Sequence, residues 1–268
     1  MKKSEEYKPL RQKIVVLTGA GISQESGIKT FRDSDGLWEN HRIEDVATFE
    51  AGKRNPDMVR SFYNQRRKEL YNVEPNEGHK QLLRLEKNFE LQIITQNVDD
   101  LHERVGCKKV LHLHGELKKV CSEVDSRDVR LLEGWELTED MKDNYGRPLR
   151  PYIVWFGESV PNIEPAIELC EQADIMIIIG TSLNVYPAAS LLNYTKKDCK
   201  KYFNRDALCI LDPVFLANDV IYHKLFESIN QTKDEYIFCY ILLSFLFALK
   251  HNFFEMNSFL QIHFFLLF

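Results

Sequence analysis

Short apolar runs alternate with amphipathic stretches through the first two hundred residues. Four runs rich in β-branched residues, each followed by a turn, occur at residues 13–18, 91–95, 110–113 and 173–179. Such runs are typical of strands that are buried on both faces, and helix-competent sequence such as residues 79–87 separates them. The pattern predicts an α/β fold with a Rossmann-like, doubly wound parallel sheet. Functional residues should then cluster at the carboxyl ends of the strands.

Two excursions interrupt this alternation. Residues 34–77 read as loop and helix, and residues 118–150 are polar without a clear period. We expect the two segments to form one smaller, helical module beside the sheet. The sheet domain would then comprise residues 9–33, 78–117 and 151–230.

Composition narrows the class of protein. The chain has 268 residues, which is enough to bury a substantial hydrophobic core. Its net charge of -5 shows no excess of basic residues, so direct binding of nucleic acid is not indicated. Six cysteines are scattered along the chain, and the N-terminal segment is charged rather than apolar. Reduced thiols and a cytoplasmic location are expected. We also expect a monomer.

Residues 231–268 differ in composition from the rest of the chain, because they contain nine of the seventeen phenylalanines. The apolar run at residues 236–249 is shorter than the ~20 residues that a helix needs to cross a bilayer. We expect this apolar tail to lie outside the fold. Membrane association is the alternative interpretation.

A glycine turn, Gly19-Ala20-Gly21, follows the first predicted strand. A strand that feeds such a turn before a helix offers N–H groups to a phosphate. A dehydrogenase fingerprint would have a third glycine where Gln24 stands. Taken by itself, the turn is also consistent with an ordinary tight connection.

The stretch at residues 19–32, GAGISQESGIKTFR, resembles the signature of the sirtuin (Sir2) family, with Lys29 where many members have proline. Four further segments resemble motifs of that family in the family's order: TQNVD at 95–99, HLHG at 112–115, the segment 150–158 with IVWFGE, and GTS at 180–182. The resemblance covers about two thirds of the chain. It implies an NAD-dependent protein-lysine deacylase.

The resemblance also implies roles for individual residues, with NAD as co-substrate. The residues implied for the NAD phosphates and ribose are Gly19, Ala20, Gly21, Gly180, Thr181 and Ser182. Those implied for the nicotinamide side are Phe31, Arg32, Gln96, Asn97 and Asp99. Without the resemblance, Asn97 and Asp99 could equally cap the next helix.

In the chemistry that the resemblance implies, the acyl-lysine carbonyl oxygen attacks the ribose carbon as nicotinamide departs. His114 then accepts a proton from a ribose hydroxyl as general base, and O-acyl-ADP-ribose results. The backbone of residues 154–158 would pair with the acylated substrate protein as an added strand. The implied substrate-binding residues there are Val154, Phe156, Gly157 and Glu158. A histidine at a strand end is otherwise often structural.

The sequence departs from the family in two places. Most sirtuins hold a structural zinc with two cysteine pairs, whereas residues 118–150 contain Cys121 and no second cysteine. We expect a zinc-free module in which Trp135 and Leu137 provide apolar packing. Beyond Thr195 the match fades, a strand core is predicted at residues 207–211, and Asp212 is a weak candidate for the adenosine ribose.

The helix expected to begin near Asn55 suggests an acyl preference. Its apolar stripe comprises Met58, Val59, Phe62 and Leu70, with Tyr63 at the border and Arg66 inside. Arg67 and Lys68 are expected in solvent. Tyr63 and Arg66 resemble the Tyr-x-x-Arg pair of sirtuins that remove succinyl and malonyl groups, which implies that preference, with acetyl-lysine as a possible second substrate.

Two other functions remain open from the sequence. One keeps the fold and transfers a single ADP-ribose to protein, which is a minor activity of the family. The other is an NAD-binding scaffold without turnover, because the C-terminal part is altered.

Overall fold

The computed structural model describes residues 11–29, 37–38 and 41–204. The chain divides into two compact units, residues 1–210 and 211–268, and the description below concerns the first. Several predicted features lie outside the described residues: Phe31, Arg32, the strand core at 207–211, Asp212 and the apolar tail.

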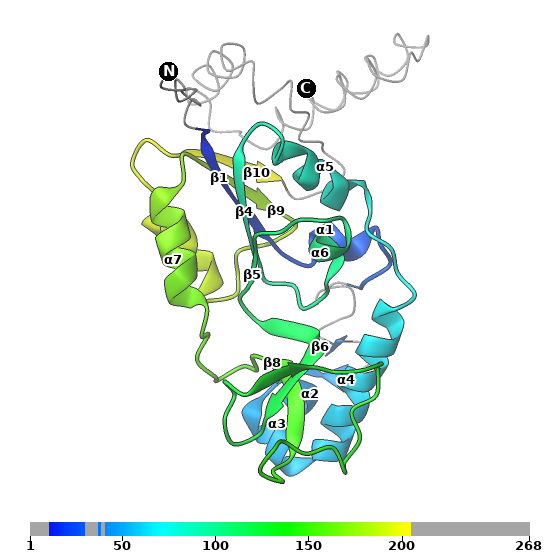
Figure 1. Ribbon diagram of the computed structural model, residues 1–268. Helices are drawn as coiled ribbons and strands as arrows, with labels where there is room; N and C mark the ends of the chain where they lie inside the picture. Colours follow the sequence, from blue (N-terminus) through cyan, green and yellow to red (C-terminus); the bar gives the residue numbers. More distant parts are fainter. Residues whose placement is uncertain (1–10, 30–36, 39–40, 205–268) are drawn as a thin grey trace, which may run out of the picture. The chain divides into compact units, whose positions relative to one another are not determined.

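A five-stranded parallel sheet in the order β10-β9-β1-β4-β5 forms the centre of the first unit (Figure 1). Its strands are β1 (Lys13–Thr18), β4 (Glu90–Thr95), β5 (Val110–His112), β9 (Ile175–Ile179) and β10 (Lys200–Asn204). Strand β1 pairs with β4 and β9 on its two sides. The predicted Rossmann-like α/β fold is confirmed.

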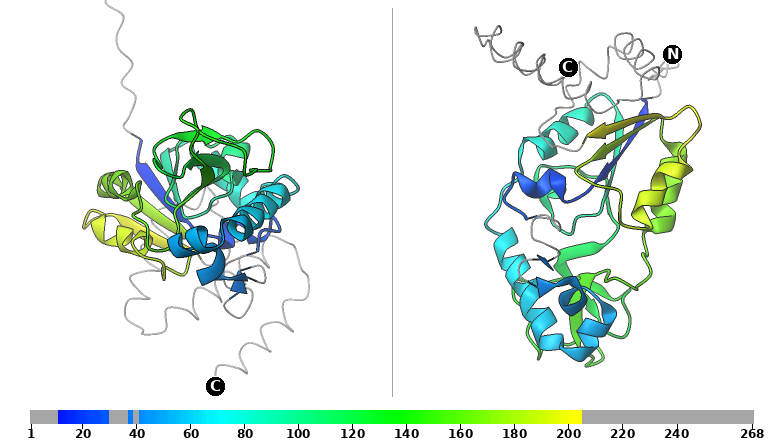
Figure 2. Two further views of the ribbon diagram at one scale, coloured as in Figure 1. Left: turned by 90° about the horizontal axis from the view of Figure 1, so that it is seen from below. Right: turned by 180° about the vertical axis from the view of Figure 1, so that it is seen from behind.

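Helices cover both faces of this sheet (Figures 1 and 2). On one face lie α7 (Ile163–Gln172) and the 3-10 helix η1 (Ala188–Tyr194), and on the other lie α1 (Gly21–Gln24), α5 (Glu77–Leu85) and α6 (Leu101–Arg104). Strand residues pack with α7 and η1 in one apolar cluster that includes Val15, Leu17, Met176, Ile178, Ala166 and Leu191. Burial from both sides explains why the strands are almost continuously apolar.

Strand β10 occupies a position that the sequence analysis did not predict. It pairs in parallel with β9 along its full length, from Lys200 opposite Ile175 to Asn204 opposite Ile179. The strand contains two lysines, so it does not form an apolar run in the sequence. Lysine is nevertheless common on a strand at the edge of a sheet.

The first excursion is helical, as predicted. It contains two short strands, β2 (Leu37–Trp38) and β3 (His41–Arg42), followed by α2 (Ile43–Val46), α3 (Phe49–Arg54) and α4 (Pro56–Leu70). Asn55 caps α4, since its side-chain oxygen accepts a hydrogen bond from the Met58 N–H at 3.2 Å. The cap and Pro56 at the first helical position fix where α4 begins.

The second excursion is not helical, contrary to the prediction. It forms an antiparallel sheet in the order β7-β6-β8, built from β6 (Gly115–Ser122), β7 (Val129–Leu131) and β8 (Leu149–Ile153). Its apolar residues, Val120, Leu132 and Leu137, form a small core of their own. Only a few inward positions of these short strands are apolar, so the segment shows no clear period. Leu137 packs there as expected.

Arg67 is buried, which contradicts the expectation that it lies in solvent; its relative exposure is 0%. Its Nη1 donates to Asn64 Oδ1 at 2.8 Å and to the Trp135 carbonyl at 2.7 Å, and its Nε donates to the Leu117 carbonyl. Asn64 also exchanges two hydrogen bonds of 2.9 Å with the Leu137 backbone. These contacts tie α4 to the second excursion, and they satisfy most of the polar groups that burial desolvates.

Three further findings concern the described residues. Cys107, Cys121, Cys170 and Cys199 are free and buried. Within the described ranges, no three His, Cys, Asp or Glu residues are grouped so that they could hold a metal ion. None of the helices in this part of the chain is both long and apolar enough to cross a membrane.

Candidate functional site

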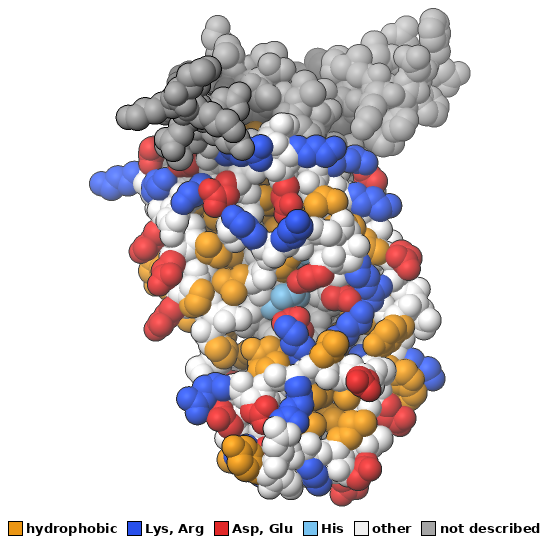
Figure 3. Space-filling view, in the orientation of Figure 1, with side chains coloured by type: hydrophobic (Ala, Val, Ile, Leu, Met, Phe, Trp, Pro, Cys, Tyr) orange, Lys and Arg blue, Asp and Glu red, His pale blue; other side chains and the backbone are white. Residues whose placement is uncertain are grey.

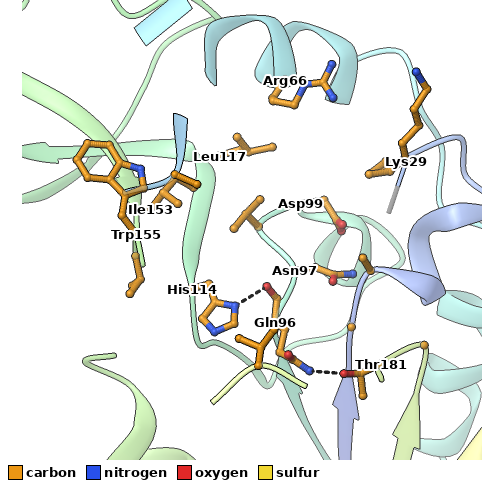
Figure 4. Close-up of a pocket in the computed structure, with 18 of the residues that line it drawn as sticks. Lys29, Arg66, Gln96, Asn97, Asp99, His114, Leu117, Ile153, Trp155 and Thr181 are labelled. Carbon is orange, nitrogen blue, oxygen red and sulfur yellow. Dashed lines mark hydrogen bonds between the residues drawn. The ribbon is translucent and has the colours of Figure 1, made fainter. Parts of the chain in front are cut away.

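A cavity of about 1010 Å³ lies where the carboxyl ends of the parallel strands meet the helical and antiparallel excursions. Sixteen of the predicted site residues line it: Gly19, Ala20, Gly21, Tyr63, Arg66, Gln96, Asn97, Asp99, His114, Val154, Phe156, Gly157, Glu158, Gly180, Thr181 and Ser182. Figure 4 shows Leu117, Ile153 and Trp155 on one side of it. The sequence analysis assigned no role to Leu117 or Ile153, because contact with the cavity leaves no local signal in an apolar strand.

The two glycine loops, after β1 and after β9, are in direct contact. The Gly21 N–H donates to the Gly180 carbonyl at 2.8 Å, and Gln96 Nε2 donates to Thr181 Oγ1 at 2.9 Å. Gly180 has a φ of 62°, and a Cβ added there would lie 2.3 Å from the Ile22 nitrogen. Any other residue would therefore force the loops apart. Their backbone is free of bulky side chains where it borders the cavity, as close approach to a phosphate requires.

At the cavity wall, a buried chain of hydrogen bonds fixes the turn after β4. Asn97 Nδ2 donates to Ser23 Oγ at 3.0 Å, and Ser23 Oγ donates to Asp99 Oδ2 at 2.9 Å. Asp99 Oδ1 accepts from the N–H of Leu101, the first residue of α6, at 3.2 Å, so Asp99 contacts the start of α6 as well as lining the cavity. Burial raises the pKa of Asp99 above its ordinary value, although these hydrogen bonds oppose the shift. The sequence analysis did not assign Ser23 a role.

His114 presents an unprotonated nitrogen for chemistry. Its Nδ1 lies 3.0 Å from the Gln96 carbonyl, as the dashed line in Figure 4 marks. A carbonyl can only accept, so Nδ1 carries the proton and Nε2 keeps its lone pair. Burial lowers the pKa of His114, although the hydrogen bond to Gln96 opposes this. The imidazole is therefore neutral near pH 7 and able to act as a general base.

Tyr63 and Arg66 come from α4 and reach the same cavity. The Tyr63 hydroxyl accepts a hydrogen bond of 3.1 Å from Trp155 Nε1, and complete burial raises the pKa of this phenol far above its ordinary value. Arg66 forms an ion pair with Glu69 at 2.5 Å, and its side chain is 11% exposed. Figure 4 shows the Arg66 side chain at the far side of the cavity from Thr181. The lining of the cavity thus includes a neutral phenol and, near one end, a guanidinium.

The segment at residues 154–158 is held in place by hydrogen bonds within the chain. The N–H groups of Val154 and Phe156 donate to the carbonyls of His114 and Ala47 at 3.0 and 2.9 Å. The Trp155 N–H donates to the Glu158 carboxylate at 2.9 Å, and Glu158 pairs with Arg150 at 2.8 Å. A peptide added alongside would therefore pair mainly with carbonyl oxygens of this segment.

Comparison with known proteins decides the family. A model of the Sir2 family matches residues 19–187. The chain belongs to the Sir2 family. An NAD-dependent protein deacylase of Bacteroides thetaiotaomicron is 54% identical over 194 residues, which cover 70% of this chain and 83% of the relative. An NAD-dependent protein deacylase of Helicobacter pylori is 55% identical over 192 residues, 71% of this chain and 82% of the relative.

A solved structure of a Sir2 homologue also resembles this chain. A complex of a mutant Sir2 homologue with ADP-ribose has a TM-score of 0.67 to this chain at 39% identity, covering 72% of this chain and 80% of the other. The family inferred from the five sequence motifs is confirmed.

Proposed function

We propose that this Sir2 family member is an NAD-dependent protein-lysine deacylase that releases nicotinamide and O-acyl-ADP-ribose. One observation carries the proposal: His114, with its Nε2 unprotonated, lies in the same cavity as both glycine loops. The relatives that are named NAD-dependent protein deacylases support it, since the chain shares more than half of its aligned residues with them.

The residues present fit NAD as co-substrate. The glycine loops at 19–21 and 180–182 give backbone access for phosphates, while Gln96, Asn97 and Asp99 offer polar atoms for ribose hydroxyls and the nicotinamide amide. NAD supplies a ribose carbon that becomes electrophilic as nicotinamide leaves. His114 Nε2 accepts the proton of a ribose hydroxyl, and the apolar side chains of Leu117, Ile153 and Trp155 exclude water from the acyl chain.

The test is a reaction of the full chain with NAD and an acylated peptide. We expect nicotinamide release that depends on the acylated peptide, and a peptide whose mass falls by that of the acyl group. A mass gain of one ADP-ribose on protein would instead support the mono-ADP-ribosyl transfer alternative. If NAD binds but neither product forms, the scaffold alternative holds.

We further propose that the enzyme prefers succinyl- or malonyl-lysine. Tyr63 and Arg66 line the cavity together, and the Trp155 N–H holds the phenol in place. A guanidinium has five N–H donors, so Arg66 can keep its ion pair with Glu69 and still bind an acyl carboxylate. Leu117, Ile153 and Trp155 add apolar surface to the same cavity, which leaves acetyl-lysine as a second substrate.

Arg66→Met is expected to weaken recognition of succinyl-lysine by about 2–5 kcal/mol, the usual effect of removing one partner of a buried charge pair. Deacetylation should survive, because an acetyl group has no carboxylate. The measurement is kcat/KM for one peptide carrying either acyl group. Arg60→Met on the same helix serves as the matched control, since Arg60 pairs with Asp57 and Glu139. Equal losses for both acyl groups would make Arg66 structural.

We also propose that the small module contains no zinc. Cys121 stands alone within residues 118–150, and Arg67, Asn64 and the cluster around Leu137 already hold the segment together. Elemental analysis of the purified protein should find no stoichiometric zinc, and activity should survive a strong chelator. One zinc per chain would contradict this, and a known zinc protein measured alongside provides the control.

For partners and location, we propose acylated protein substrates, no nucleic acid and a cytoplasmic site of action. Basic and acidic side chains are interspersed over the face drawn in Figure 3, rather than gathered in a basic stripe. The four described cysteines are free thiols, which fits a reducing compartment.

A further inference from the structure

Two histidines, one at the end of β5 and one two residues beyond it, hold two consecutive carbonyl groups of the turn after β4. His114 Nδ1 lies 3.0 Å from the Gln96 carbonyl, and His112 Nδ1 lies 2.9 Å from the Asn97 carbonyl. Between them, the Leu113 N–H donates to the Thr95 carbonyl at 2.9 Å. Three successive residues, at the end of β5 and directly after it, therefore fix the backbone from which Asn97 and Asp99 project.

His112 differs from His114 in its second nitrogen. His112 Nε2 lies 2.8 Å from the Glu103 carboxylate on α6. Its two partners, a carbonyl and a carboxylate, both accept hydrogen bonds. A proton on each ring nitrogen satisfies both contacts, so the geometry favours the imidazolium form of His112. His114, which has one acceptor partner, stays neutral.

The charges around His112 are consistent with a cation there. Burial by itself would lower the pKa of His112, but the hydrogen bond and charge of Glu103, together with Glu116 on β6, raise it above the ordinary value. His102 also interacts electrostatically with His112, but burial lowers the pKa of His102 well below the ordinary value, so His102 is neutral. The charge of His112 in turn lowers the pKa of Asp99, which burial alone raises.

We propose that His112 and Glu103 form a positioning pair for the nicotinamide side of the cavity. The protonated His112 fixes the Asn97 carbonyl and favours the ionised form of Asp99, so that both side chains keep their orientation toward the cavity. His112 acts through these residues, because it is buried behind the turn and the described cavity wall does not include it. The inference deepens the proposed deacylase function and rests on it.

The pair predicts the pH dependence of turnover. Activity should rise with pH as His114 loses its proton, at a pH below the ordinary range for histidine because its pKa is lowered. Activity should fall as pH rises through the raised pKa of His112, because the imidazolium is then lost. Glu103→Gln removes the carboxylate but keeps an amide that can hydrogen-bond to Nε2. The falling limb should then move to lower pH by about 1–3 units, while the rising limb stays in place.

The experiment measures kcat and both KM values against pH for the wild type and for four variants of the full chain. Beyond Glu103→Gln, His112→Leu should lower kcat by about 10- to 100-fold, as a misplacement of ~1 Å can do, with little change in KM for the acylated peptide. His112→Asn should recover part of the loss, because its amide can still donate to the Asn97 carbonyl. Glu90→Gln, which breaks an exposed ion pair with Lys109 of 3.2 Å, is the control and should match the wild type.

Histidine NMR gives a readout that does not need turnover. In the wild type, the pKa of His112 should lie above the ordinary value for histidine, and in Glu103→Gln it should fall. An unshifted falling limb in Glu103→Gln, or a His112 pKa in the wild type that is not raised, would overturn the proposed pair. Absence of deacylation in the wild type would overturn the proposed function instead, while the NMR result would still decide the protonation of His112. If His112→Leu fails to fold, the Glu103→Gln variant decides.

Discussion

His114→Ala is expected to abolish deacylation while NAD still binds. Loss of a general base typically lowers the rate by ~10²–10⁴-fold. We expect no other residue of the cavity to take over the role of His114 as the base. The Gln96 carbonyl fixes the ring so that Nε2 is the free base, and alanine removes both the base and this hydrogen bond. The glycine loops after β1 and β9 are held by their own contacts, so the phosphate site should persist.

The measurement pairs kcat on an acylated peptide with NAD affinity from calorimetry. His114→Gln provides the matched variant, because its amide can donate to the Gln96 carbonyl but cannot act as a base near pH 7. It should be as inactive as the alanine variant. Full activity in either variant would remove His114 from the catalytic role.

The second large effect is expected in stability. Arg67→Met should lower the free energy of unfolding by about 3 kcal/mol or more, because each buried acceptor left without a donor costs roughly 1–3 kcal/mol. The acceptors that lose their donor are the carbonyls of Leu117 and Trp135. The side-chain oxygen of Asn64 also loses Arg67, but it keeps the hydrogen bond from the Leu137 N–H. Burial lowers the pKa of Arg67 to about 10, so the guanidinium remains charged at neutral pH.

Urea unfolding of the full chain measures this effect. Lys68→Met is the matched control on the next position of α4, since Lys68 is exposed and contacts the face of Trp135. We expect the control to change stability by less than about 0.5 kcal/mol, as surface substitutions usually do. If Arg67→Met were no more destabilising than Lys68→Met, the hydrogen bonds of Arg67 would contribute nothing net to the fold.

The amino-acid sequence by itself determined the parts of this protein that are locally encoded. Strand β1 and the turn Gly19-Ala20-Gly21 could be predicted because an apolar run and its glycines are adjacent in the chain. The start of α4 could be predicted because Asn55 and Pro56 act on the next few residues. The placement of His114 beside the glycine loops also followed, since the carboxyl ends of parallel strands meet at one edge of the sheet.

The tertiary structure decided what depends on partners far away in the chain. Arg67 reads as a solvated cation, yet its acceptors Leu117 and Trp135 are 50 and 68 residues away and exist as a group only in the fold. The charge state of His112 likewise depends on Glu103 and Asn97 both facing it. Strand β10 exists because β9 offers an open edge for hydrogen bonding. Burial and pairing of polar groups are properties of the assembled neighbourhood, and no short window of sequence contains that neighbourhood.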